Sequence, residues 1–146
     1  MLMNFLSENN TTQALQLIKY LRNCISNPDI KKNPIEKFIS AGIVDTLSKV
    51  LKFDNFGEDI LVESCWFFCN IFSRESELFQ NYIDRSIIER LLEFLVSPNT
   101  ALASNALFAI ANLCGDIKFR DAYVELGIHD KVKTFYEIRD ISQNID

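Results

Sequence analysis

The sequence predicts an all-α fold in which similar helices are stacked in order along the chain. A nearly continuous apolar stretch over residues 62–72 contains Trp66 and, four positions later, Asn70. The same spacing returns at Phe108 and Asn112, forty-two residues further along. Residues i and i+4 lie on one face of an α-helix, so each pair points to one side. With only four Gly and three Pro, the chain favours long helices and short connections.

The first helix is expected over residues 11–26. Its apolar residues recur with the period of a helix, and either Thr11 or Thr12 can cap its N-terminus. Asn27-Pro28 would end it, because the residue before a proline avoids the α conformation.

A short helix, a break and two further helices follow. Pro34 suits the first turn of the short helix, and Gly42 suits the left-handed residue that ends it. The next helix is predicted over residues 43–51. After a charged loop, the helix that contains Trp66 is predicted over about 59–73.

The same order of elements returns in the second half of the chain. Helices are predicted, in turn short, medium, long, short and medium, over residues 78–83, 87–95, 101–114, 119–125 and 128–136. The breaks fall at Gly42, near Ile87 and at Gly127, with spacings of 45 and 40 residues. A unit of about 42 residues and three helices is typical of armadillo repeats.

We therefore predict a right-handed armadillo-repeat solenoid of about three three-helix repeats. It would occupy residues 11–138, divided at about 11–52, 53–95 and 96–138, between tails at 1–10 and 139–146. The helix over 60–73 is apolar on nearly every face, as expected of a helix packed between neighbours in a stack. Its polar exceptions, Glu63 and Asn70, would mark its exposed strip.

The composition indicates a globular protein with an acidic surface. Hydrophobic residues make up 48% and charged residues 24%, the net charge is −5 and the pI is about 4.9. Nucleic-acid binding depends on phosphate neutralisation by Lys and Arg, so this balance disfavours it and suits a basic partner. The chain lacks the run of about eighteen apolar residues that a membrane span needs.

Reactive or metal-binding chemistry is not expected. Cys65 and Cys69 are four residues apart, but the one histidine, His129, is distant in sequence, so no zinc site is predicted. Neither a nucleophile–base pair nor a phosphate-binding glycine loop is evident, and we predict no enzyme and no cofactor. All four cysteines lie in apolar helical stretches without a secretory leader, and reduced, buried thiols are predicted at Cys24, Cys65, Cys69 and Cys114.

Three segments resemble the importin-α family, whose members are receptors for nuclear localisation signals. Residues 63–71, with Glu-Ser-Cys-Trp at the start and Asn-Ile at the end, resemble the second armadillo repeat of that family. Residues 105–116, followed by Phe119-Arg120-Asp121, resemble the third repeat, and residues 34–44 the first. The similarity covers about residues 11–136.

The resemblance implies a groove that binds an extended basic peptide. In the family, the third helix of each repeat lines the groove, where Trp rings hold the stems of Lys or Arg and Asn side chains bond the peptide backbone. An acidic residue pairs with the most important lysine. Carried over to this sequence, the peptide-binding residues would be Trp66, Asn70, Phe108, Asn112 and Asp116.

These residue types suit that task. A ring face attracts a cation by about 0.5–2 kcal/mol. An Asn side chain offers both a donor and an acceptor, which match a peptide bond of any sequence. The resemblance further implies Lys/Arg-rich signal peptides of cargo proteins as partners, contact with importin-β, and a location in cytoplasm and nucleus.

The sequence departs from the family pattern in three ways. Phe108 replaces a Trp and offers a smaller ring. Arg74 and Phe79 stand where the family has a Gly and a Thr, so Arg74 could repel the bound lysine or pair with Asp116 and close its pocket. The chain opens without a basic N-terminal arm, so recruitment of importin-β through such an arm is not expected.

Simpler roles stay open for the same residues. Trp66 could also be a core residue, and Asn70 and Asn112 could form hydrogen bonds between stacked helices. Asp116 could be the cap of a helix. Glu63 could contact a ligand or be a solvated charge. The alternative function is an armadillo-repeat interaction scaffold, or a fragment of a longer solenoid, that no longer binds localisation signals.

Overall fold

The computed structural model describes residues 2–7, 10–26, 34–53, 56–74, 77 and 79–143. Over these ranges the regular secondary structure is helical and no strand occurs, which confirms the all-α prediction. No helix in the same ranges has the length and apolar character needed to cross a bilayer. The elements are α1 (Leu2–Ser7), α2 (Thr11–Ser26), α3 (Ile35–Ser40), α4 (Ile43–Lys52), α5 (Glu58–Phe72), the 3-10 helix η2 (Gln80–Tyr82), α6 (Arg85–Phe94), α7 (Thr100–Leu113), α8 (Ile117–Glu125) and α9 (Ile128–Gln143).

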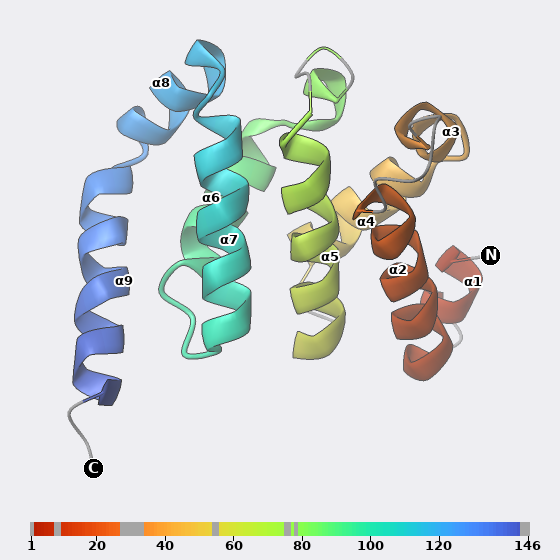
Figure 1. Cartoon of the computed structure of the whole chain (residues 1–146), viewed down its shortest axis with the longest axis horizontal. Helices are drawn as coiled ribbons and strands as arrows, with labels where there is room; N and C mark the ends of the chain where they lie inside the picture. Colours follow the sequence, from red (N-terminus) through yellow and green to blue (C-terminus); the bar gives the residue numbers. More distant parts are fainter. Residues whose placement is uncertain are drawn as a thin grey trace.

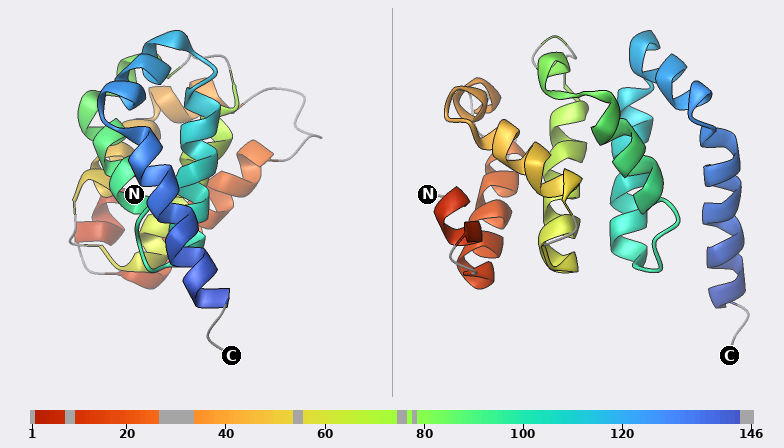
Figure 2. Two further views of the ribbon diagram at one scale, coloured as in Figure 1. Left: turned by 90° about the vertical axis from the view of Figure 1, so that its left-hand side faces the viewer. Right: turned by 180° about the vertical axis from the view of Figure 1, so that it is seen from behind.

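Three long helices, α2, α5 and α7, lie side by side with their C-terminal ends pointing the same way (Figure 1). The helices α4 and α6 cross on the other side of this row, as the view from behind shows (Figure 2). A short, a medium and a long helix follow one another twice, first as α3, α4 and α5 and then as η2, α6 and α7. The long helices therefore form one layer of the molecule.

The middle long helix, α5, is enclosed by its neighbours. It packs against α2 on one side and α7 on the other, and both Phe67 and Phe68 are fully buried. Aromatic rings continue from Phe68 to Phe72 and on to Phe79, with centroids 5.4 and 5.2 Å apart. This burial explains why the sequence of α5 is apolar on so many faces.

Two of the predicted breaks between helices are left-handed glycines. Gly42 precedes α4 with a φ of 70°, and Gly127 precedes α9 with a φ of 76°. A residue with a Cβ would cost roughly 1–2 kcal/mol in this conformation, so glycine is favoured at both sharp turns. The third break uses an extended residue instead, Asp84, which caps α6 by accepting a hydrogen bond from the Ile87 amide at 3.2 Å.

The N-terminal residues differ from the tail predicted at 1–10. Leu2–Ser7 form α1, which packs against α2 and α4, and Leu2 is buried in the core. A helix of one and a half turns shows too little periodicity to be recognised from its sequence. Its stability comes from tertiary packing rather than from local propensity.

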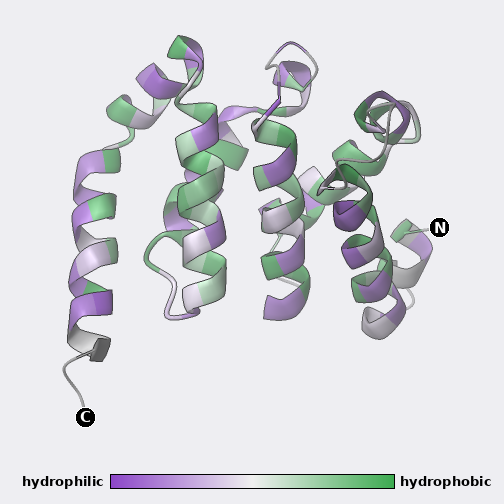
Figure 3. Ribbon diagram, viewed as in Figure 1, coloured by the Kyte–Doolittle hydropathy of each residue, from purple (hydrophilic) through white to green (hydrophobic). Residues whose placement is uncertain are grey.

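The last helix, α9, is longer than predicted and runs to Gln143, past residue 136 and into the tail predicted at 139–146. The Arg139 guanidinium donates to the Ser97 carbonyl at 3.0 Å and so ties the added turns to the segment that precedes α7. In Figure 3, α9 is drawn mostly in purple, in keeping with its many charged residues. Its apolar stripe is therefore too weak to show where the helix ends.

The N-cap of α2 and the short helix before α6 differ in detail from the prediction. Asn10 caps α2 in place of Thr11 or Thr12, because its Oδ1 accepts a hydrogen bond from the Gln13 amide at 3.4 Å. The short helix predicted over 78–83 is the 3-10 helix η2. The predicted turn at Asn27-Pro28 lies outside the described residues.

Replacing Asp84 with alanine is expected to lower the free energy of unfolding by about 1 kcal/mol, the usual contribution of an N-cap. Besides capping α6, the Asp84 carboxylate pairs with Lys52 at an oxygen–nitrogen distance of 2.6 Å. Partial burial alone would raise its pKa. Hydrogen bonds from Lys52, Ser86 and the Ile87 amide outweigh this effect and lower the pKa of Asp84 to about 2.

The stabilisation by Asp84 should depend on pH. The folded pKa, about 2, lies below the unfolded value of about 3.9, so the carboxylate stabilises the fold above about pH 4 and loses this effect as the pH falls through about 2. In urea titrations, the gap between wild type and Asp84→Ala should therefore narrow as the pH is lowered. Asp84→Asn keeps a capping oxygen and should be less destabilised near neutral pH. An equal gap at every pH would contradict this assignment.

Candidate functional site

Trp66 on α5 and Phe108 on α7 are large apolar side chains that reach the surface. Trp66 is 42% exposed and Phe108 61% exposed, although each belongs to a helix that contributes several residues to the core. The two helices are held in register by Asn105, whose Nδ2 donates to the Val62 carbonyl at 3.2 Å. Trp66 and Phe108, which are one repeat apart in the sequence, therefore lie at corresponding positions on two adjacent parallel helices.

The Trp66 ring is covered in part by a residue of α2. The Arg22 guanidinium carbon lies 3.9 Å from the centroid of the Trp66 ring, and its Nε donates to Glu63 Oε2 at 2.8 Å. The Arg22 and Glu63 side chains are only 15% and 12% exposed. The prediction that Glu63 belongs to an exposed strip of α5 is therefore wrong, because α2 packs over it.

The two asparagines four residues after the rings donate hydrogen bonds to the neighbouring helix. Asn70 Nδ2 donates to Ser26 Oγ at 2.8 Å, and Asn112 Nδ2 donates to the Cys69 carbonyl at 2.9 Å. Both side-chain amides thus join adjacent long helices, which is the simpler role that the sequence left open. Within the described ranges, no hydrogen bond reaches the Oδ1 atom of either residue.

A cavity of about 540 Å³ opens where α5 and α7 end. It brings together four residues that the sequence singled out: Arg74, Phe79, Asn112 and Asp116. Phe79 is buried, and its ring packs against that of Phe72 in one wall of the cavity. The full lining consists of Phe72, Ser73, Arg74, Phe79, Asn112, Leu113, Gly115, Asp116 and Phe119.

The cavity is lined by groups of both signs, among them the cation Arg74. The C-terminal ends of α5 and α7 meet there, and each end carries partial negative charge from its last carbonyl groups. Asp116 adds a carboxylate. Its Oδ1 also accepts a hydrogen bond from the Lys118 amide at 2.9 Å and so caps α8. The cap holds the carboxylate in a fixed position on the cavity wall.

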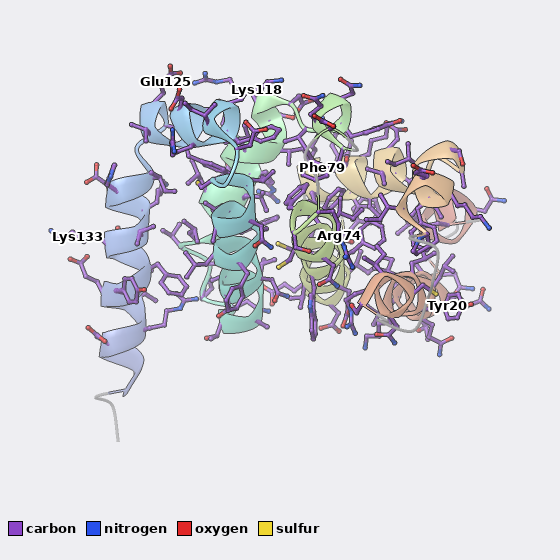
Figure 4. The ribbon with its side chains drawn as sticks, turned by 45° about the horizontal axis from the view of Figure 1, so that its top comes forward. Tyr20, Arg74, Phe79, Lys118, Glu125 and Lys133 are labelled. Carbon is purple, nitrogen blue, oxygen red and sulfur yellow. The ribbon has the colours of Figure 1, made fainter. Side chains whose placement is uncertain are left out.

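Arg74 neither pairs with Asp116 nor closes the cavity by such a pair. Its Nη2 donates to the Ile25 carbonyl at the end of α2, at 3.3 Å, and no ion pair between described residues joins Arg74 to Asp116. Figure 4 shows Arg74 between the end of α5 and α2, with Phe79 near it. The guanidinium is therefore bound to the end of α2, while Arg74 also lines the cavity between α5 and α7.

The cysteines are free thiols. Burial raises the pKa of Cys65, which also lies close to Cys69, and burial likewise raises the pKa of Cys69. Burial therefore disfavours the reactive thiolate form at both positions. Among the residues that the structure describes, no three His, Cys, Asp or Glu side chains gather where they could hold a metal ion.

Sequence reasoning missed the contribution of α2 to this region. Arg22 and Ser26 are four residues apart and precede Trp66 and Asn70 by 44 positions, so they occupy the corresponding places on the first long helix. That repeat spacing was the available signal. An Arg and a Ser do not resemble a Trp and an Asn, so the correspondence is not evident from the residue types.

A search against models of protein families finds none that matches this chain.

Proposed function

We propose that this chain binds an extended peptide rich in Lys or Arg across the C-terminal halves of α5 and α7. The observation that carries the proposal is the cavity lined by Asn112 and Asp116, at the ends of two parallel helices. The exposed ring of Phe108 lies one helical turn before Asn112 on the same helix. A carboxylate, helix C-termini and an aromatic face each attract a lysine or arginine side chain.

Each group has a distinct task in this proposal. The Asp116 carboxylate pairs with the charged head of one basic residue in the cavity. The Phe108 ring contacts the aliphatic stem of a neighbouring basic residue. The Oδ1 atoms of Asn70 and Asn112 accept hydrogen bonds from the peptide backbone, while their Nδ2 atoms stay bound to the adjacent helix.

The proposed architecture is the right-handed armadillo solenoid, with α2, α5 and α7 as the third helices of successive units. The repeated order of short, medium and long helices supports it. In this role the chain acts as an importin-α-like adaptor for cargo that moves between cytoplasm and nucleus. The net charge of −5 favours encounter with basic peptides.

A second candidate is a scaffold that binds another partner and no longer binds localisation signals. The contact of Arg22 with Trp66 favours this alternative, because it covers a ring that the family uses for ligand binding. The asparagine donors, which bond neighbouring helices, favour it too.

A titration separates the two candidates. A fluorescein-labelled lysine-rich peptide should bind the protein with a rise in anisotropy, and raised salt should weaken the binding. The same peptide with its lysines replaced by glutamine serves as the control and should not bind. Equal binding of both peptides, or none of the lysine peptide at low salt, would reject the basic-peptide function in favour of the scaffold.

A further inference from the structure

The first long helix, α2, carries its own version of the ring-and-amide pair. Arg22 and Ser26 are four residues apart, and both contact the matching residues of α5: Arg22 covers the Trp66 ring, and Ser26 Oγ accepts a hydrogen bond from Asn70 at 2.8 Å. Between α5 and α7, by contrast, Phe108 stays 61% exposed. The ring at the α2–α5 interface, that of Trp66, is therefore partly covered by the preceding long helix, whereas the ring at the α5–α7 interface, that of Phe108, is mostly exposed.

At the Trp66 ring, Arg22 makes the contacts that the arginine side chain of a bound peptide would make. Its guanidinium lies 3.9 Å from the ring centroid, and its Nε donates to the Glu63 carboxylate at 2.8 Å. A ring face and a carboxylate together form a site for one guanidinium. The chain itself supplies that group from α2, the long helix that precedes α5.

Further contacts hold the end of α2 in place over this site. Arg74 donates to the Ile25 carbonyl at 3.3 Å, and Ser26 Oγ–H donates to the Arg22 carbonyl at 3.0 Å. The Arg22 side chain is 15% exposed, so it is packed into the interface rather than free to swing away. A peptide cation cannot reach the covered ring face unless these contacts break.

We infer that Arg22 is an internal occupant of the Trp66 position and that it restricts the peptide site to the α5–α7 side. This inference rests on the proposed function and deepens it. A basic side chain of the ligand would meet the Arg22 charge and a ring face that is already covered. Arg22 is thus a specificity-determining residue, which limits the number of basic residues that the site accepts.

Removal of Arg22 should open a second position for a basic residue. Arg22→Ala is expected to bind the lysine-rich peptide about tenfold more tightly than wild type, the size of one cation–π contact with a nearby carboxylate. Because Trp66 is the only Trp, its fluorescence should also become more accessible to a neutral quencher such as acrylamide. Anisotropy titration and acrylamide quenching measure these two effects.

Lys19→Ala is the matched control for charge. Lys19 lies on the same helix, 4.0 Å from the other Glu63 oxygen, and its side chain is 48% exposed. Its removal changes the net charge by the same amount as Arg22→Ala but leaves the Trp66 ring covered. We expect Lys19→Ala to change peptide affinity by less than about twofold, since exposed pairs contribute little.

A second variant controls for the loss of stability that Arg22→Ala can cause. Arg22→Ala leaves the Glu63 carboxylate without its closest partner, whereas Arg22→Ala combined with Glu63→Gln removes both charges of the buried pair and preserves the net charge. This double variant should still show increased quenching and tighter binding than the single variant Glu63→Gln. Thermal unfolding followed by circular dichroism shows whether each variant is folded.

The outcomes separate the inference from the proposed function. Tighter binding by Arg22→Ala but not by Lys19→Ala supports the inference, even if wild type binds too weakly to measure. Equal effects of both variants would show that only charge matters and would overturn it. Weaker binding by folded Arg22→Ala would overturn it too, since Arg22 would then support the site. Binding by neither wild type nor Arg22→Ala would reject the inference and the proposed function together.

Discussion

Replacing Phe68 with alanine is expected to lower the free energy of unfolding by about 3–5 kcal/mol. The Phe68 side chain is fully buried in α5, and its ring lies between those of Phe67 and Phe72, with centroids at 5.6 and 5.4 Å. Removal of the ring would leave a void in the middle of the stack, because the helices on both sides are held by their own contacts. Urea unfolding at equilibrium measures the loss.

Phe108→Ala is the matched control for that substitution. It makes the same chemical change on the equivalent type of helix, but the Phe108 ring is 61% exposed. We therefore expect a loss of less than about 1 kcal/mol. Equal destabilisation by the two variants would contradict the account of α5 as the enclosed helix.

Replacing Asp116 with asparagine is expected to weaken binding of the lysine-rich peptide about ten- to hundredfold. An ion pair in a partly enclosed site contributes about 1.5–3 kcal/mol, and asparagine cannot supply its charge. Asparagine can still cap α8, because its Oδ1 can accept the hydrogen bond that the Lys118 amide now donates to Asp116 at 2.9 Å. Peptide affinity should therefore fall while the melting temperature changes little.

Asp116→Ala removes both the charge and the cap and completes the comparison. It should bind the peptide as weakly as Asp116→Asn, and it should also be less stable by about 1 kcal/mol. Wild-type affinity in a folded Asp116→Asn variant would show that Asp116 serves only as a helix cap. The ligand site would then have to be sought elsewhere.

Much of the fold could be predicted from local patterns. The helix over 11–26 and the breaks at Gly42 and Gly127 agree with the structure, because periodic apolar residues and left-handed glycines act within one or two turns. The short helix α1 could not be predicted, since its stability depends on contact with α2 and α4. Local patterns contain no information on such contacts.

The candidate site could be predicted only in part. Asn112 and Asp116, which the family resemblance implied as neighbours in a groove, do line one cavity, and their role in peptide binding stays a prediction. The partner of Trp66 could not be found in this way. Arg22 is 44 positions away, at the edge of the apolar stripe of α2, and nothing in the local pattern indicates what it contacts. Whether a charged side chain faces water or an aromatic ring is decided by the helix packed beside it.

The most direct test of the proposed site is a titration of the isotopically labelled protein with the lysine-rich peptide, followed by two-dimensional NMR. We predict that the resonances of the Asn112 side-chain amide and the backbone amide of Gly115 shift first, because both residues line the cavity between α5 and α7. Amides of α9, for example that of Tyr136, should stay in place. Shifts confined to α9, or no shifts at saturating peptide, would contradict the central claim.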